Sequence, residues 1–139
     1  MELELKKHCV PLLKERGFKG SFPNMYRETE GFVSLINFQF FSSGGSFCIN
    51  LSFSGPNREN VYFEKETKVK KLKVSQTSER VRLGSENLKG DNWFSFGKTS
   101  YGEYRGNPIP PQELTERINN LIESQAEPWW ASKYEQTKS

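Results

Sequence analysis

Hydrophobic and polar residues alternate along two neighbouring segments of the chain, residues 32–41 and residues 46–54. Alternation with a period of two residues is typical of a β-strand that buries one of its faces. The two segments are separated by Ser42-Ser43-Gly44-Gly45, and glycine readily takes the positive φ that tight hairpin turns require. The pattern therefore predicts an antiparallel β-hairpin, and it indicates the fold class more clearly than a function.

The position of the turn sets the register of this hairpin. A turn centred on Ser43 and Gly44 gives the pairs Phe40–Phe47, Phe38–Ile49 and Ile36–Leu51 on one face, and Gln39–Cys48 and Asn37–Asn50 on the other. A change of parity would bury Asn50 and Gln39 and expose the hydrophobic side chains. Burial of one such hydrophobic side chain is worth roughly 1.5–3 kcal/mol. We therefore assign the phenylalanine-rich face to the core and expect a mostly polar second face, with the exceptions Val33, Leu35 and Phe41.

Helical patterns lie near both ends of the chain. Residues 2–16 carry a rough apolar stripe before Gly17, formed by Leu3, Leu5, Cys9, Leu12 and Leu13, and Pro11 is expected to kink or split this helix. A second helix is expected from Pro110-Pro111, with the stripe Leu114, Ile118, Leu121 and Ile122 facing the core. We expect Pro128 to end this helix, and residues 131–139 to form a frayed polar tail after a single domain of residues 1–130.

The remaining strands are shorter and less regular. Strands are predicted at about 24–28, within 80–84 and within 93–97, with turn residues Gly90-Asp91-Asn92 between the last two. Residues 61–63 are a candidate strand end, and the stretch 65–76, which contains five lysines, is interpreted as a loop or an edge strand. Together these elements predict an α+β domain: one twisted, mostly antiparallel sheet of five or six strands, with the N- and C-terminal helices packed on one face.

Composition adds limits rather than a function. The 139 residues suit one small domain, and the aromatic share of 14% suggests an aromatic-rich core. Twenty basic and 17 acidic residues leave a net charge of +3, which is too balanced to indicate nucleic acid or an anionic membrane surface. The sequence shows no signal peptide or long apolar run, so we expect a cytoplasmic protein with two free thiols, Cys9 and Cys48.

Several short motifs resemble one known family. They are Leu12-Leu13-x-x-x-Gly17-Phe18, Arg27-Glu28-x-x-Gly31-Phe32, Ile36-Asn37-Phe38-Gln39, Gly45-x-Phe47-x-Ile49-Asn50-Leu51, Arg80-x-Arg82-Leu83-Gly84, Trp93 and Pro128-Trp129. This string, from about Leu3 to Trp130, resembles the bacterial family catalogued as domain of unknown function 4304. The resemblance implies a small α+β domain, bacterial and cytosolic, with no established catalytic residues. Several members of the family carry a cysteine shortly before the arginine pair, where this chain has Thr77 and Ser78, so a thiol role is not expected there.

The inventory of reactive side chains does not favour an enzyme. The chain has one histidine, His8, and one aspartate, Asp91, and neither lies in a recognisable catalytic or metal-ligand spacing. His8 is interpreted as a surface residue of a helix, and Asp91 as a residue that organises a turn. The 16 glutamates include no pair that its spacing singles out as an acid and a base. We therefore expect no catalytic residues, no metal and no cofactor, and we leave an unnamed activity open.

Binding has better candidates than catalysis. Asn37, Gln39, Asn50 and Ser52 are expected to form a polar stripe on the non-core face of the hairpin, where amide groups offer paired donors and acceptors. The alternative is an ordinary solvated sheet face. Arg82 would join the stripe if its strand lies alongside, and otherwise makes a surface salt bridge. Trp93, Trp129 and Trp130 are candidate anchors for a protein partner, or else they close the core.

Three functions remain open at this point. The first is a non-catalytic protein-interaction module, of which an immunity-type or regulatory partner of a toxin or enzyme is one version; that version rests on analogy. The second is a small-ligand domain that uses Asn37, Gln39, Asn50 and Arg82. The third is weak nucleic-acid binding through the lysine-rich segment 65–73, which the charge balance disfavours. We expect a protein partner and no membrane, and the sequence leaves the partner's identity and the oligomeric state open.

Overall fold

A computed structural model describes residues 1–58, 61 and 68–138. Its strands are β1 (Lys19–Ser21), β2 (Asn24–Thr29), β3 (Phe32–Phe40), β4 (Ser46–Ser54), β5 (Val81–Arg82) and β6 (Phe94–Ser95). Its helices are α1 (Glu2–His8), α2 (Val10–Glu15), α3 (Pro111–Leu121), α4 (Glu127–Thr137) and a π-helical turn, η4 (Ile122–Ala126). Short 3-10 turns are η1 (Val69–Lys71), η2 (Val74–Gln76) and η3 (Glu86–Leu88).

The hairpin of β3 and β4 has the predicted register. Its pairs are Phe40–Phe47, Phe38–Ile49, Ile36–Leu51, Gln39–Cys48 and Asn37–Asn50. Gly44 and Gly45 in the turn both have φ near +82°. A Cβ at Gly45 would lie 2.7 Å from the carbonyl oxygen of Gly97, whereas a Cβ at Gly44 would meet open space. Gly45 therefore serves both the turn and the close approach of the segment that follows β6.

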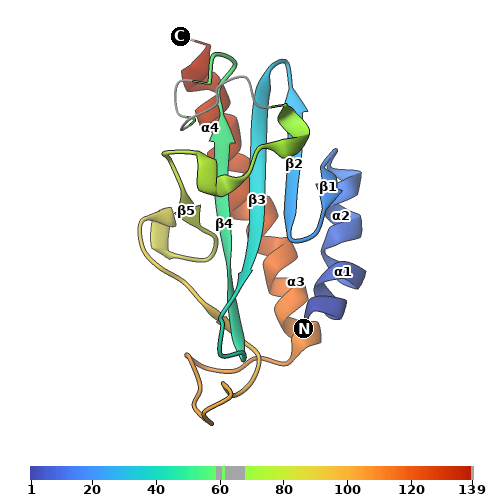
Figure 1. Cartoon of the computed structure of the whole chain (residues 1–139), viewed down its shortest axis with the longest axis vertical. Coiled ribbons are helices and arrows are strands. Elements are labelled where there is room, and N and C mark those ends of the chain that lie inside the picture. Colours follow the sequence, from blue (N-terminus) through green and yellow to red (C-terminus); the bar gives the residue numbers. More distant parts are fainter. Residues whose placement is uncertain (59–60, 62–67, 139) are drawn as a thin grey trace.

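The sheet is antiparallel throughout its described pairs and confirms the predicted fold class. The order is β1-β2-β3-β4-β5, and β6 pairs with the same edge of β4 as β5 does. Figure 1 shows α3 and α4 behind the sheet and α1 and α2 beside them, so the helices cover one face. We call this the inner face, and the opposite side, which is turned toward the viewer, the outer face. Strand β1 had no clear sequence signal.

The main core lies between the inner face and the helices. It contains the inward residues of the hairpin together with residues of each helix, including Leu5, Leu13, Leu114, Ile118 and Trp130. The N-terminal helix is split at Cys9, as expected beside Pro11. Leu3 and Leu12 of its predicted stripe are exposed, which corrects the expectation. Leu5, Cys9 and Leu13 occupy i, i+4 and i+8 and form the buried line, while Leu12 points about 100° away from Leu13.

The C-terminal helix continues past Pro128, so the prediction that it ends there is wrong. The π-helical turn η4 connects α3 to α4, and Pro128 lies in the first turn of α4, where its missing N–H costs little. The prediction of a frayed tail after Trp130 is also wrong, because α4 runs to Thr137. Tyr134 donates a hydrogen bond to Glu30 at 2.6 Å and packs against Phe32 at 5.2 Å between ring centroids.

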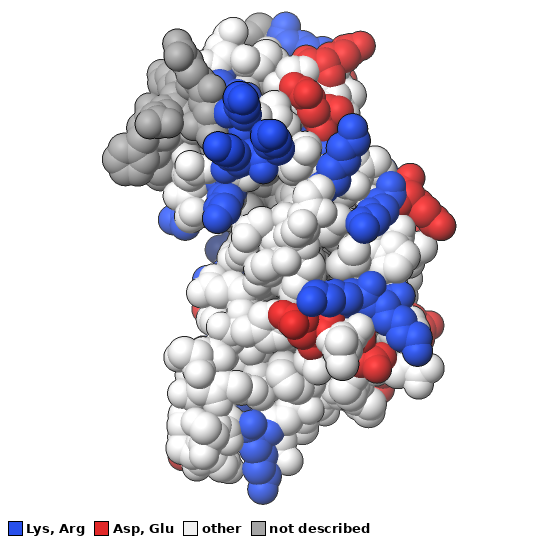
Figure 2. Space-filling view, turned by 45° about the vertical axis from the view of Figure 1, so that its right-hand side comes forward, with Lys and Arg blue, Asp and Glu red and all other residues white. Residues whose placement is uncertain are grey.

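The outer face is partly covered rather than wholly solvated. Val33 and Leu35 form a second small core with Val61, Leu72 and Val74, so η1, η2 and their flanks lie over this end of the sheet. The lysine-rich stretch is therefore a loop with two short turns in its described part, and residues 62–67 lie outside the described residues. Its described lysines, Lys68, Lys70, Lys71 and Lys73, are exposed. Figure 2 shows a group of basic side chains next to the grey part of the surface.

Candidate functional site

A row of amide side chains crosses the open part of the outer face. Asn24 on β2, Asn37 on β3 and Asn50 on β4 stand opposite one another, and Arg82 on β5 faces Asn50. Asn37 donates to Asn24 at 2.8 Å, Asn50 donates to Asn37 at 3.0 Å, and Arg82 Nε donates to Asn50 Oδ1 at 2.7 Å. Asn50 Nδ2 also donates to Gln39 Oε1 at 3.0 Å. We call Asn24, Asn37, Gln39 and Asn50 the amide row.

The antiparallel register explains why these side chains meet. Residues opposite one another in neighbouring strands have Cβ atoms about 4.5–5.5 Å apart, which suits direct hydrogen bonds between amides. Arg82 reaches the row because β5 pairs with β4 at Asn50, as the sequence analysis required for Arg82 to join the stripe. The structure therefore brings Asn37, Gln39, Asn50 and Arg82 together.

Arg82 also links the amide row to a group of charged and aromatic side chains. Its Nη1 donates to Asp91 Oδ1 at 2.5 Å, and its guanidinium lies 5.2 Å from the centre of the Trp93 ring. Trp93 Nε1 donates to Asp91 Oδ2 at 3.2 Å. The guanidinium of Arg105 lies 4.7 Å from the Trp93 ring and 4.1 Å from the Phe41 ring. We call Phe41, Arg82, Asp91, Trp93 and Arg105 the arginine–tryptophan cluster.

A shallow cavity lies beside these groups. Its volume is about 270 Å³, and its lining is mainly polar, formed by Gln39, Asn50, Arg80, Val81 and Arg82. Cys48 is buried next to it, with Sγ 3.6 Å from Gln39 Oε1. Burial raises the pKa of the Cys48 thiol, and the nearby Arg82 charge only partly opposes this. A protonated thiol is a poor nucleophile, so the arrangement is suited to binding rather than to thiol chemistry.

Three predicted site residues lie elsewhere. Ser52 is buried beneath the loop that contains η2, where its hydroxyl contacts Thr77 Oγ1 and donates to the carbonyl of Glu79 at 3.0 Å. Trp130 is buried in the main core and donates from Nε1 to the carbonyl of Ser52 at 2.8 Å. Trp129 packs against Phe53 at the edge of the same core. The alternative of core closure therefore describes both tryptophans of α4.

The site contains residues that sequence reasoning did not select. Asp91 was interpreted as a turn residue; it does accept its neighbour's backbone N–H at 2.8 Å, but it also contacts Arg82 and Trp93. Asn24 could have been found by extending the amide pairing to the preceding strand. Arg105 could not be found from hydrophobic periodicity, because it lies in the irregular loop between β6 and α3. A hydrogen bond holds this loop to the hairpin turn: the Ser100 N–H donates to the Ser43 carbonyl at 2.7 Å.

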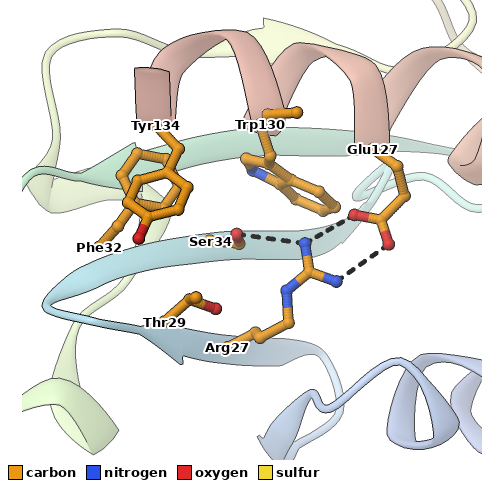
Figure 3. A pocket seen from close by; sticks show the side chains of 8 residues that line it. Arg27, Thr29, Phe32, Ser34, Glu127, Trp130 and Tyr134 are labelled. Carbon is orange, nitrogen blue, oxygen red and sulfur yellow. Dashed lines mark hydrogen bonds and ion pairs between the residues drawn. The ribbon is translucent and has the colours of Figure 1, made fainter. Parts of the chain in front are cut away.

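A second cavity, of about 320 Å³, lies between the sheet and α4 (Figure 3). Arg27 makes a two-pronged ion pair with Glu127, at 2.6 and 2.9 Å, and Arg16 contacts the same carboxylate at 3.1 Å. The Arg27 guanidinium also lies 4.6 Å from the Phe18 ring and 5.3 Å from the Trp130 ring. Burial alone would raise the pKa of Glu127, but the hydrogen bonds and charges of the two arginines outweigh it and lower the pKa. Arg27 also donates from Nη1 to the Arg16 carbonyl and from Nη2 to Ser34, so each Nη group makes two contacts. Arg27 therefore joins α4 to the sheet.

Cys9, His8 and the acidic side chains are the other reactive groups of the described residues. Burial raises the pKa of the Cys9 thiol to about 12. His8 lies 3.3 Å from Glu4 on the exposed part of α1. Among residues 1–58, 61 and 68–138, no three His, Cys, Asp or Glu side chains are placed to hold a metal ion. Across the same described ranges, no helix combines the length and the apolar character that crossing a bilayer would need.

Comparison with known proteins and families identifies the family of this chain. No curated protein and no solved structure matches the chain significantly. A family model described as domain of unknown function (DUF4304) matches residues 9–132. This range includes every strand of the sheet, the amide row and the arginine–tryptophan cluster. The match confirms the resemblance seen in the sequence, and the chain belongs to the DUF4304 family, a domain family of unknown function.

Proposed function

We propose that this domain is a non-catalytic protein-binding module whose partner docks on the open part of the outer face, over the arginine–tryptophan cluster. Tryptophan, tyrosine and arginine dominate the energetics of protein interfaces, especially where they are held rigid at the centre of a contact. Two further aromatic residues, Tyr101 and Tyr104, lie in the loop that carries Arg105, and they are 56% and 51% exposed. This composition supports the proposal of a protein-binding surface.

One observation carries the proposal. The Arg105 guanidinium lies against Phe41 and Trp93, yet among the described residues it has no carboxylate partner, and its Nε has no hydrogen-bond acceptor. A guanidinium that is packed on two rings has already lost much of its conformational freedom, so binding to it costs less entropy. Its Nε is buried, but its Nη donors, which have no acceptor among the described residues, are available to an acidic group of a partner.

The two other functions from the sequence analysis are less well supported. The cavity of about 270 Å³ is smaller than most small-molecule pockets and opens to solvent, so we treat it as a subsite of the protein interface. The turn η1, whose lysines are exposed, lies toward the opposite end of the outer face from the β3–β4 turn (Figure 1). They therefore do not combine with Trp93 and Arg105 into the single basic and aromatic surface that nucleic-acid binding favours. By analogy alone, an immunity-type or regulatory role toward a toxin or enzyme fits a domain of this kind.

A comparison of two charge reversals tests the proposal. Arg105→Glu reverses a charge in the cluster, and Arg117→Glu makes the same change on the exposed side of α3, where Arg117 contacts only Glu113 within the described residues. The tagged protein and both variants are used to capture partners from a lysate of the native host, after thermal unfolding confirms that all three are folded. We expect Arg105→Glu to weaken capture of a specific partner by about tenfold or more, and Arg117→Glu to leave it unchanged. Equal capture by all three proteins would contradict the proposal.

A further inference from the structure

We infer that the cavity lined by Gln39, Asn50, Arg80 and Arg82 is a carboxylate-binding site, and that its ligand is an acidic side chain of the docked partner. This inference rests on the proposed function, because it names the chemical group that the partner contributes next to Trp93. Three features of the site support it: the directions of the hydrogen bonds in the amide row, the charges around the cavity and the size of the cavity.

Arg82 sets the direction of every hydrogen bond in the amide row. A guanidinium has donors and no acceptor, so Asn50 must turn its oxygen toward Arg82 Nε. The nitrogen of Asn50 then faces Asn37 and Gln39, and both of these residues must present their oxygens to it. The oxygens of Gln39 and Asn50 are therefore occupied by partners inside the protein.

The polar groups left for a ligand are donors. Within the described part of the chain, the amide nitrogen of Gln39 has no hydrogen-bond partner, since only its oxygen is used. Arg82 uses Nε and Nη1, and its Nη2 has no partner among the residues that the structure describes. Arg80 is exposed at the cavity and forms no ion pair with any described residue. A site whose available groups are all donors selects an anion over a cation or a carbonyl-rich neutral ligand.

The charges favour a monoanion. Arg80 and Arg82 contribute two positive charges, and Asp91 offsets one of them through its contact with Arg82. The residues that line the cavity, together with Asp91, therefore carry one net positive charge, and Arg105 lies outside this lining against Trp93. One positive charge matches one carboxylate better than it matches a phosphate, which carries close to two negative charges at neutral pH. A volume of about 270 Å³ accommodates a carboxylate with a short methylene stem. The position beside Trp93 lets the rest of the partner chain pack on the ring while its carboxylate enters the cavity.

The test uses isotope-edited NMR on the full chain, following the side-chain amide of Gln39 and the Nε–H of Arg82. The probes are a blocked Gly-Glu-Gly peptide, the blocked Gly-Gln-Gly peptide as its neutral counterpart, and acetate as a free carboxylate. The proteins are the unchanged chain, Arg80→Gln, which removes a charge at the cavity, and Arg117→Gln, which removes one on α3. Both substituted residues are exposed, so the backbone spectrum serves as a check that each variant is folded.

We expect the glutamate peptide to cause saturable shifts of both signals in the unchanged protein. Binding to Arg80→Gln is expected to be weaker by about threefold or more, and Arg117→Gln is expected to bind as the unchanged protein does. Shifts that are absent, or equal with the glutamine peptide, overturn the inference. If acetate binds as tightly as the glutamate peptide, the carboxylate site stands and its assignment to a partner side chain is overturned. Partner capture that depends on Arg105 but not on Arg80 would leave the proposed function standing and remove this inference.

Discussion

The ion pair between Glu127 and Arg27 makes a quantitative prediction about stability. Glu127→Gln keeps the size of the side chain but removes the charge that two arginines share. The side chains of Arg27 and Glu127 are 19% and 24% exposed, so the pair is partly shielded from water. The variant should therefore leave the Arg27 guanidinium without its counter-charge between Phe18 and Trp130.

The size of the effect follows from this partial burial. Removing one member of a fully buried ion pair costs about 3–5 kcal/mol, whereas an exposed pair is worth about 0–1 kcal/mol. The Glu127 site lies between these limits, and a glutamine oxygen still accepts one hydrogen bond from Arg27, so we expect a loss of about 2 kcal/mol near neutral pH. In urea unfolding, this corresponds to a midpoint lower by about 1 M for a chain of this size.

The effect should also depend on pH in one direction. Because the pKa of Glu127 is lowered in the folded state from its ordinary value of 4.5, the stabilisation by the ionised pair is fully present above 4.5. It is lost as the pH falls through the folded-state pKa. The difference in unfolding free energy between the unchanged protein and Glu127→Gln should therefore be constant near neutral pH and shrink in acid.

Urea unfolding at several pH values, followed by tryptophan fluorescence, measures this difference. Glu113→Gln is the matched control, because Glu113 contacts Arg117 at 3.5 Å on an exposed turn of α3 and is 54% exposed. We expect that control to change stability by less than about 0.5 kcal/mol. The reasoning is refuted if Glu127→Gln is no more destabilising than Glu113→Gln, or if its effect grows as the pH falls.

Two further predictions concern the hairpin turn and the thiols. Gly45→Ala should lower the unfolding free energy by more than about 1 kcal/mol, because the new Cβ would meet the Gly97 carbonyl. Gly44 has the same φ but open space around its Cβ position, so Gly44→Ala should cost less. Equal losses of unfolding free energy for the two variants in urea would contradict this prediction. Cys9 and Cys48 should react with a thiol reagent far more slowly in the native protein than in urea, because both are buried and burial raises both pKa values. Rapid native labelling of either cysteine would show that the burial is misassigned.

Residue spacing was enough to predict most of the sheet, though not β1, and about half of the candidate site. Parity alone placed Asn37, Gln39 and Asn50 on one face, because a strand has only two faces and the hydrophobic residues claim one of them. For Arg82 the expectation was conditional on the position of its strand, and the structure meets the condition because β5 pairs with β4 at Asn50. These features are set by short-range geometry, which a single sequence contains.

The features that were missed depend on contacts between distant segments. Ser52 lies on the same face of β4 as Asn50, but the loop around η2 covers it. The alternation of hydrophobic and polar residues in a strand does not predict which end of the sheet a loop will cover. Arg105 reaches Trp93 through an irregular loop. Pro128 is usually a signal for the end of a helix, but here it follows the π-helical turn η4 and the chain stays helical. The helix continues because Trp130 packs in the core and Tyr134 packs against Phe32.

The edge strands of the sheet limit how another chain can bind to it. On one side, β1 has three residues and ends shortly before Pro23; on the other, the border of β4 is occupied by β5 and β6, each two residues long. Neither margin presents a long run of unpaired backbone groups within the described residues, and such short terminal strands resist extension by an added strand. A partner chain would have to lie across the strands and contact them through side chains. Its orientation would then not be fixed by hydrogen bonds between backbones.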